Sequence, residues 1–516
     1  MERRALIALA LSFVVFMGFM YYGEKTKTPT APAPATQTAA PAPVAPTPKP
    51  APAAVHPAPP VRPQPSRPAK DVVVDTPSFK AVFTELGGRL KSFHLKKYKD
   101  RIPFEPIYHF KLGPVALEVD RYREPTENGS KYKELVREGD AIELPLTLSC
   151  EGKTLNFSGL ALCDASTSAL TLKAGEKGTL KFTCVSPEGL TVVKTFTFKG
   201  DSYGFDLAVE VTNRTGQALD GQLNLDLSEN FAGEEANRFH FLGFNGSINN
   251  KLEDIKSGDV KEKTKSGEVL HSKTYTGKVE WAGLDEGYFL TAIIPESAKS
   301  WITLSEPPKS SMVASVRTPV EALGAGQAAR FSYVLYFGPK NLDDLKPFGL
   351  DRAVNFGWFD FLGKPLLKFL NWLERYSFNY GWAIVILTIL LRIVFWYPNH
   401  KSYKSMKDMQ KLQPKVAKLR EKYKDDKETM NKELMALYRT FKVNPMAGCL
   451  PMVLQLPVFI ALYNVLGYAI ELRHASFIPT LPFTNIVWLA DLSAKDPLLI
   501  TPLVMGATMF LQQKMT

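Results

Sequence analysis

The stretch VNPMAGCLPMVLQLPVFIALYNVLGYAI, residues 443–470, contains no charged side chain. Its apolar part, Cys449–Ile470, is long enough for an α-helix to cross the ~30 Å hydrocarbon core of a lipid bilayer. Gln455 lies inside this part between Pro451 and Pro457, whose rings kink a helix and free backbone carbonyls. A glutamine at this depth either holds helices together or lines a polar cavity, and both interpretations stay open. The stretch predicts a membrane protein.

Two other C-terminal segments have a similar composition. Trp382–Tyr397 is apolar except for Thr388 and Arg392, and Pro497–Gln512 carries no charge. Thr388 and Arg392 are four residues apart, so they project from one face of a helix. An arginine roughly 15 Å into such a helix is costly to expose to lipid, and no Asp or Glu occurs within any predicted span to pair with it. We expect Arg392 to line a water-filled, positively charged cavity; the alternative is that it snorkels to the interface near Pro398.

The positive charge of the chain is concentrated in one loop. The formal net charge is +11, and residues 401–442 carry 13 Lys/Arg against 6 Asp/Glu, a local excess of 13 − 6 = +7. A basic loop between two hydrophobic segments is typical of the cytoplasmic side, so it favours a membrane-orientation signal over a specific nucleic-acid surface. With that loop inside, the predicted crossings place the N-terminus and Lys514 in the cytoplasm and the region after the first crossing in the periplasm.

The same loop contains two apolar stripes at helical spacing, divided by Asp425-Asp426. We expect two amphipathic helices that form a cytoplasmic hairpin over residues 399–445. Methionines are adaptable contacts for varied apolar chains, but packing of the two helices on each other or on anionic lipid explains much of the same pattern. The stripes are Met406, Met409, Leu412, Val416, Leu419 and Tyr423, and then Met430, Leu434, Leu437 and Phe441.

The N-terminus has the layout of a secretion signal, because Arg3 and Arg4 precede the apolar run Ala5–Tyr22. The run is longer than the ~7–15 residues usual for a cleaved signal. Residues 1–24 are therefore expected to form an uncleaved transmembrane anchor, with a cleaved signal peptide as the alternative. Residues 25–70 hold fifteen of the 38 prolines among Ala, Thr and Val. Such a segment cannot bury a core and is expected to be an extended linker.

Residues 71–340 show short runs of alternating apolar and polar residues bounded by turn residues. This pattern predicts a large antiparallel β-sandwich, in the periplasm on the orientation above. Asn213–Gly216 and Asp220-Gly221 are predicted turns. Scaffold is the commoner role for such a domain, although sandwiches also bind sugars or partners. The alternation is clearest in Phe205, Leu207, Val209 and Val211, and in Leu223, Leu225 and Leu227.

The sequence shows no catalytic or metal-binding motif. Its four cysteines form no CxxC pair, and the histidines of the sandwich are far apart along the chain. At most one disulfide can join two of Cys150, Cys163 and Cys184, and the sequence does not select the pair. We expect no cofactor and no enzymatic activity. A sugar-active enzyme would need convergent acids in the sandwich, and a transporter would need a continuous polar path.

Residues 341–380 become helical and aromatic. Leu366, Leu367, Leu370 and Leu373 share one helix face, with Lys364, Lys368, Asn371 and Glu374 opposite. Trp358 and Trp372 suit the headgroup region of a bilayer. The segment is predicted to consist of interfacial amphipathic helices, with a helix packed on the β domain as the alternative.

Four stretches of the C-terminal region carry a family resemblance. They are KVNPMAGCLPMVLQLPVFIALY at Lys442–Tyr463, Glu471-Leu472-Arg473, DLSAKDP at Asp491–Pro497 and MGATMFLQQKM at Met505–Met515. Together they resemble the YidC/Oxa family of membrane insertases over about 380–516. The order of anchor, Pro-rich linker and large β domain resembles the long form of that family, found in bacteria with an outer membrane.

The resemblance implies a groove that is open to the cytoplasm and lipid, closed to the outside, and charged by Arg392. It also implies that Thr388, Leu456 and Phe459 match positions that touch the incoming segment, and that Gln455 matches a polar groove position. The position of Leu456 is often methionine in the family.

The implied activity is insertion and folding of nascent membrane proteins, alone or with the Sec translocon. Other implied partners are the ribosome, the signal-recognition-particle receptor and membrane lipid. Long-form members continue past Gln512 with two more spans, so the resemblance implies a C-terminally truncated insertase. The sequence thus predicts a multi-domain protein of the bacterial inner membrane, with a transmembrane anchor, an all-β periplasmic sandwich and an α-helical transmembrane bundle, partial over 381–516, that carries a cytoplasmic helical hairpin.

Overall fold

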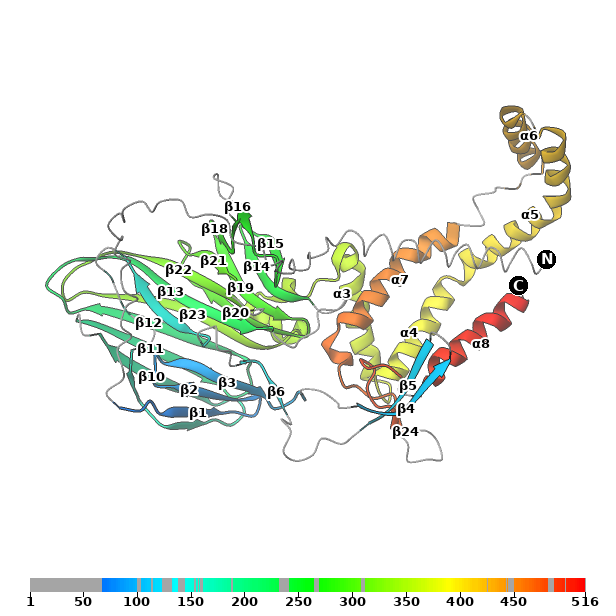
Figure 1. Ribbon diagram of the computed structural model, residues 1–516. Helices are drawn as coiled ribbons and strands as arrows, with labels where there is room; N and C mark the ends of the chain where they lie inside the picture. The colour runs from blue at the N-terminus through cyan, green and yellow to red at the C-terminus, as the bar shows by residue number, and fades with distance from the viewer. Residues whose placement is uncertain are drawn as a thin grey trace, which may run out of the picture. The chain divides into compact units, whose positions relative to one another are not determined.

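The computed structural model describes most of the chain from residue 67 onward (Figure 1). The predicted anchor, and the linker up to residue 66, lie outside the described residues. The ranges described are 67–99, 104–112, 115–122, 132–137, 144–152, 155, 157, 161–186, 189–231, 241–263, 269–307, 311–424, 426–441, 443, 450–480, 487–496 and 498–515.

The first part of the described chain forms three sheets (Figure 1). The largest has nine strands in the order β15 (Lys251–Lys256), β14 (Leu242–Ile248), β19 (Val279–Glu286), β20 (Phe289–Pro295), β23 (Ala328–Pro339), β12 (Gly204–Asn213), β11 (Leu190–Lys199), β10 (Lys177–Val185) and β8 (Cys163–Ala165). One five-stranded sheet runs β18 (Ser272–Tyr275), β21 (Trp301–Ser305), β22 (Ser311–Leu323), β13 (Leu219–Asn230) and β7 (Thr147–Glu151). The other runs β6 (Lys133–Glu134), β3 (Arg89–Leu95), β2 (Phe79–Thr84), β1 (Asp71–Asp75) and β9 (Ala169–Thr171).

Three two-stranded pairs complete the strands: β4 (Phe104–Leu112) with β5 (Val115–Tyr122), β16 (Glu262–Lys263) with β17 (Val269–Leu270), and β24 (Ile478–Thr480) with β25 (Val487–Leu489). Among the described strands, β1 and β9 pair in parallel, and the other pairings are antiparallel. The sandwich prediction is therefore confirmed in its main feature, with one parallel contact added.

Both five-stranded sheets share a core with the nine-stranded sheet. The β2 ring of Phe83 lies 4.9 Å from that of Phe196 on β11, and the β22 hydroxyl of Thr318 lies 3.3 Å from that of Tyr333 on β23. Removing large aromatic side chains from water is the main force that holds such layers together. The predicted alternation is confirmed, because its apolar positions are buried: Phe205, Leu207, Val209 and Val211 on β12, and Leu223, Leu225 and Leu227 on β13.

One predicted turn is wrong. Asp220 and Gly221 lie inside β13, where the pairing with β22 shifts between Leu219 and Gly221. A DG pair is a strong local turn signal, but here the strand continues through a bulge. Pairing along β22 and β7 on its two sides outweighs that local preference.

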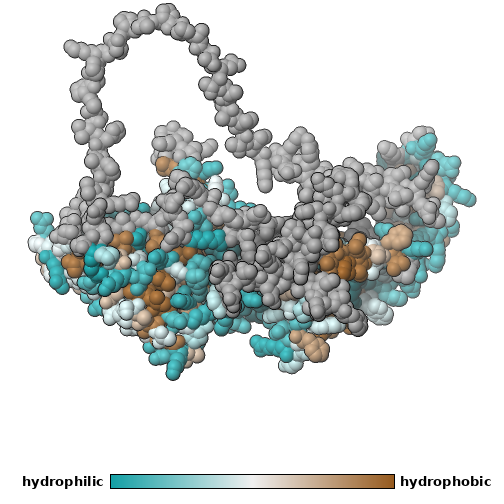
Figure 2. All heavy atoms as spheres, turned by 60° about the horizontal axis from the view of Figure 1, so that its bottom comes forward, coloured by the Kyte–Doolittle hydropathy of each residue, from teal (hydrophilic) through white to brown (hydrophobic). Residues whose placement is uncertain are grey.

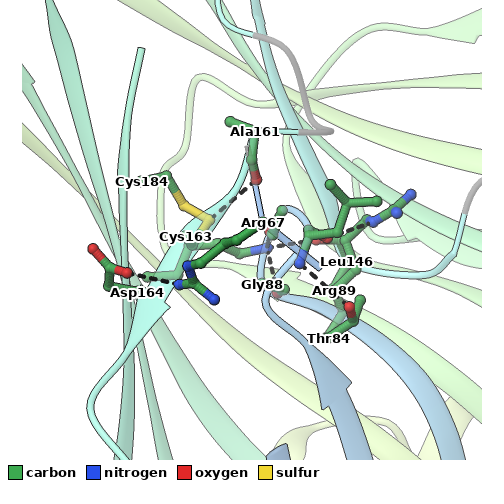
Figure 3. The surroundings of a disulfide bond; sticks show 12 residues. Arg67, Thr84, Gly88, Arg89, Leu146, Ala161, Cys163, Asp164 and Cys184 are labelled. Carbon is green, nitrogen blue, oxygen red and sulfur yellow. Dashed lines mark hydrogen bonds and ion pairs between the residues drawn. A yellow bond between two sulfur atoms is a disulfide. The ribbon is translucent and has the colours of Figure 1, made fainter. Parts of the chain in front are cut away.

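The structure selects one disulfide from the three pairs that the sequence left open. Cys163 on β8 and Cys184 on β10 are direct cross-strand neighbours and are bonded (Figure 3). Arg67 reaches across the same edge and pairs with Asp164 at 2.8 Å (Figure 3). Cys150 is a free thiol buried in the core.

A lysine lies inside this core. Lys194 on β11 is 1% exposed, and its Nζ donates to the carbonyl oxygens of Gly87, Gly88 and Leu146 at 3.1, 2.9 and 2.7 Å. Three carbonyls match the three donors of an ammonium group. Burial lowers the pKa of Lys194 to about 7.

The second part of the chain is helical. After the short α2 (Leu342–Leu345) and three 3₁₀ turns come α3 (Asp360–Glu374), α4 (Tyr380–Val394), α5 (Trp396–Lys422), α6 (Lys427–Thr440), α7 (Leu450–Tyr468) and α8 (Ile500–Met515). These 3₁₀ turns are Lys346–Phe348, Asp351–Ala353 and Gly357–Phe359, and another 3₁₀ turn, Ile470–Leu472, follows α7.

Among the described helices, none alone has both the length and the apolar composition of a membrane span. The consecutive helices α4 and α5, bent by 53° at their junction, meet that test together, and Val453–Tyr468 is a shorter apolar helix. In the view of Figure 2, hydrophilic residues with scattered hydrophobic ones cover the visible β domain, and a dense hydrophobic group marks the visible helical part.

Candidate functional site

The helix α4 presents its two polar side chains on an exposed face. Asn379 caps its start by accepting a hydrogen bond from the backbone of Trp382 at 3.1 Å. Ala383 and Leu387 are buried on the opposite face. The helix therefore has one packed face and one open face.

Thr388 and Arg392 both lie on the exposed part of α4. The Thr388 hydroxyl donates to the carbonyl of Ile384 at 2.8 Å, a local bond that satisfies the hydroxyl within its own helix. Among the described residues, no carboxylate lies within ion-pair distance of Arg392. Arg392 shares this part of α4 with the exposed apolar side chains of Ile389, Ile393 and Val394. Water or an acidic ligand would stabilise its charge in such surroundings.

The second set of candidate residues lies on α7. Leu456 and Phe459 are 55% and 53% exposed, and Gln455 is half-buried. Ala461 and Val465, on the following turns, are fully buried. The exposed half of α7 is thus apolar with one amide at its margin, which suits contact with a hydrophobic segment.

The candidate residues on α4 and those on α7 are connected through the helix α3. Among the described residues, no hydrogen bond joins Thr388 or Arg392 to Gln455. Instead α3 packs against both helices: one apolar cluster contains Leu370 and Leu373 of α3, Ala383 and Leu387 of α4, and Leu462 and Leu466 of α7. The leucine face predicted for α3 is confirmed. Trp358 and Trp372, predicted for a headgroup region, are 96% and 49% exposed.

The predicted apolar stripes also appear on α5 and α6. Leu412 is buried, and Met406, Met409 and Met430 are half-buried, whereas the lysines between them are exposed. The Nζ of Lys415 lies 4.1 Å from the ring centre of Phe441, directly after α6, so the two helices touch.

The loop that follows α7 contains functional candidates that sequence reasoning did not assign. His474 Nδ1 lies 2.8 Å from Asp491 Oδ2. Burial of Asp491 opposes its ionisation, but hydrogen bonds from His474 and Ser493 outweigh it and hold the pKa of Asp491 below its usual range. Glu471, the first charged residue after the charge-free stretch, accepts hydrogen bonds from Asn341 and Asn371. Its position directly after the charge-free stretch 443–470 was the available signal.

Comparisons with known proteins match both parts of the chain. Residues 372–516 match the family model described as 60Kd inner membrane protein, and residues 115–369 match the model described as YidC periplasmic domain. Together with the fold, these matches define an inner-membrane class of protein with a large β domain ahead of its helical region.

Relatives named "Membrane protein insertase YidC" align with the whole chain. The one from Geobacter sulfurreducens is 39% identical over 522 residues, covering 100% of this chain and 89% of the relative. The one from Geobacter metallireducens is 38% identical over 526 residues, with the same coverage of 100% and 89%. The chain therefore belongs to the YidC family of membrane protein insertases.

A solved structure also resembles part of the chain weakly. A galactose mutarotase-like protein from Lactobacillus casei gives a TM-score of 0.33 at 13% identity, covering 52% of this chain and 99% of that one.

Proposed function

We propose that the chain inserts and folds transmembrane segments of nascent proteins through a positively charged hydrophilic groove formed between α4 and α7. Arg392 attracts the acidic or polar tail of an incoming segment into the inner half of the bilayer. Thr388, Gln455, Leu456 and Phe459 contact the segment itself.

The driving force lies in the substrate. Drawing its polar tail part of the way into the membrane shortens the hydrocarbon path that the tail must cross, and burial of the apolar segment in lipid then completes transfer. No covalent chemistry and no nucleotide is involved. The protein accelerates insertion by lowering the free-energy cost of moving the polar tail of the substrate across the hydrocarbon core.

One observation carries this proposal. Arg392 is exposed on an apolar helix, one turn from Thr388, with no carboxylate neighbour among the described residues. A structural arginine in such a helix is expected to have a fixed partner, because an isolated charge in lipid is costly. An arginine that lacks one is suited to transient anionic ligands.

The surrounding parts extend the proposal. Membership of the family supports an inner-membrane protein whose β domain lies in the periplasm. In the proposed topology the N-terminus and the α5–α6 hairpin lie in the cytoplasm. There Met406, Met409, Leu412 and Met430 contact emerging apolar segments. The ribosome, the signal-recognition-particle receptor, the Sec translocon and membrane lipid are the proposed partners, and cooperation with the translocon is an alternative to acting alone.

Replacement of the arginine tests the proposal. The chain is expressed in a bacterium depleted of its own insertase, and insertion of a single-span protein with an acidic periplasmic tail is followed by protease protection. Arg392→Ala is expected to reduce insertion, and Arg392→Lys to retain most of it. Arg214→Ala removes an exposed arginine from the β domain as a matched control. Equal insertion by the Arg392→Ala variant and the control would contradict a charged groove.

A further inference from the structure

The carboxylate of Glu471 collects donors from two other parts of the chain. Nδ2 of Asn341 lies 3.1 Å from Oε1 of Glu471, and Nδ2 of Asn371 lies 3.4 Å from the same oxygen. Asn341 is the cap residue between β23 and α2, and Asn371 lies on α3. One oxygen atom of the 3₁₀ turn that follows α7 therefore joins the residue that caps α2 and the helix α3.

The contact continues from α3 to α4. The hydroxyl of Tyr380, the first residue of α4, lies 3.5 Å from Oδ1 of Asn371, a long hydrogen bond. These polar contacts connect α3 and α4 with the turn after α7, and the apolar cluster that contains Leu370 and Leu387 connects α3 and α4 with α7 itself. A shift of α3 would therefore move α4 relative to α7.

Stability alone does not account for a carboxylate at this place. Oε2 of Glu471 is buried, and it has no hydrogen-bond partner among the described residues. A buried charge with incomplete partners is generally less stabilising than a well-packed apolar residue of similar size, but its demand for partners can select one arrangement of the elements around it. The position therefore fits a residue that specifies geometry.

A second contact ties the same loop to the β domain. The guanidinium of Arg473 lies 4.9 Å from the ring centre of Phe289, at the start of β20, and 5.7 Å from that of Tyr288. Glu471 and Arg473, two residues apart after α7, thus contact the residue that caps α2 and the start of β20. These two contacts limit how far the end of α7 can turn or slide.

We propose that Glu471 is a positioning residue for the candidate groove: through Asn341 and Asn371 it fixes α3 against α4 and α7 and so sets the spacing of the helices that carry Arg392 and Phe459. The role in insertion rests on the proposed function, whereas the spacing does not. The two are therefore measured separately.

The spacing is measured by electron paramagnetic resonance between spin labels on the exposed positions Ile389→Cys of α4 and Val453→Cys of α7. The full chain is used, in bilayer nanodiscs, with Cys150 and Cys449 replaced by serine. Loss of about one hydrogen-bonded contact is expected to raise the fraction of chains outside the native distance roughly fivefold in Glu471→Ala. Glu471→Gln keeps an accepting oxygen and is expected to retain the native distance.

Asn371→Ala removes one donor and leaves the glutamate, so it tests the contact if Glu471→Ala does not fold. Its distance distribution is expected to broaden in the same way, and the two changes combined are expected to be less than additive. Glu210→Ala, which removes an exposed carboxylate of β12, is the control.

An unchanged distance distribution in both Glu471→Ala and Asn371→Ala overturns the proposal. Reduced insertion with unchanged distances overturns it as well, because Glu471 would then act in another way. Altered distances support it even if the unsubstituted chain inserts nothing, an outcome that would reject only the proposed function.

Discussion

The ring of Phe477, in the loop after α7, occupies the space that a side chain on Gly381 would need. A Cβ atom built on Gly381 would lie 2.2 Å from Cδ2 and 2.6 Å from Cβ of Phe477. The Asn379 side chain donates to the Phe477 carbonyl at 2.9 Å, and the Trp382 ring meets the Phe477 ring edge-on at 5.7 Å. The start of α4 is thus covered by an aromatic residue that fits only because residue 381 is glycine.

Gly381→Ala is therefore expected to destabilise the protein. The clash reaches the Cβ of Phe477, close to the backbone, so rotation of the ring cannot relieve it. Overpacking of this kind costs about 1–3 kcal/mol. Thermal unfolding in detergent measures the effect. The control is Gly506→Ala on α8, where the added Cβ would meet no atom outside its own helical turn within 4 Å. Equal melting temperatures for the two variants would contradict the packing described.

Lys194 is expected to give the stability a defined pH dependence. Its pKa is lowered from 10.5 to about 7 in the folded protein, so between these values the unfolded chain binds the extra proton. The free energy of unfolding should therefore rise with pH from about 7 towards 10, by of the order of 1 kcal/mol per pH unit, and this contribution should be flat below 7.

Urea unfolding followed by tryptophan fluorescence at several pH values measures that slope. Lys194→Met should remove it and also lower stability, because three buried carbonyls lose their donor. Lys181→Met, at an exposed position of β10, should leave the slope in place. The same slope in both variants would mean that Lys194 does not titrate as its burial predicts.

The Cys163–Cys184 bond is expected to stabilise the β domain. It closes a loop with a sequence separation of 21, for which chain entropy predicts roughly 3 kcal/mol. Reductant should lower the urea midpoint of the unsubstituted protein towards that of a Cys163→Ala/Cys184→Ala variant and should leave the variant itself unchanged. A midpoint that does not respond to reductant in either protein would contradict a stabilising bond.

Local sequence patterns predicted much of this structure. The features that they did not predict depend on contacts between segments that are far apart in the sequence. The alternation of β12 identified its buried face, since core and solvent lie on opposite sides of one strand. The disulfide partners could not be chosen, because β8 and β10 become neighbours only in the folded sheet. Likewise Asp220-Gly221 is a turn by local preference but a bulge once β13 has partners on both sides.

The candidate site also has features that the sequence predicted and features that it did not. Helical spacing alone placed Thr388 and Arg392 on one face of α4. Glu471 is 130 residues from Asn341 along the chain, so their hydrogen bond has no local signature. The support that α3 gives to α4 and α7 likewise depends on tertiary packing, although the leucine face that provides it was visible in the sequence.

The central claim is that a charged groove on α4 and α7 receives the substrate, and photo-crosslinking tests it most directly. A photoreactive amino acid is placed at Thr388 or at Phe459, and a short membrane protein is translated on stalled ribosomes in membranes that contain the chain. Crosslinks to the nascent span are expected from both positions, and Arg392→Ala is expected to weaken them. Crosslinks that are unchanged by that substitution would make Arg392 an interfacial or structural residue, and the absence of crosslinks from both positions would contradict the insertase groove itself.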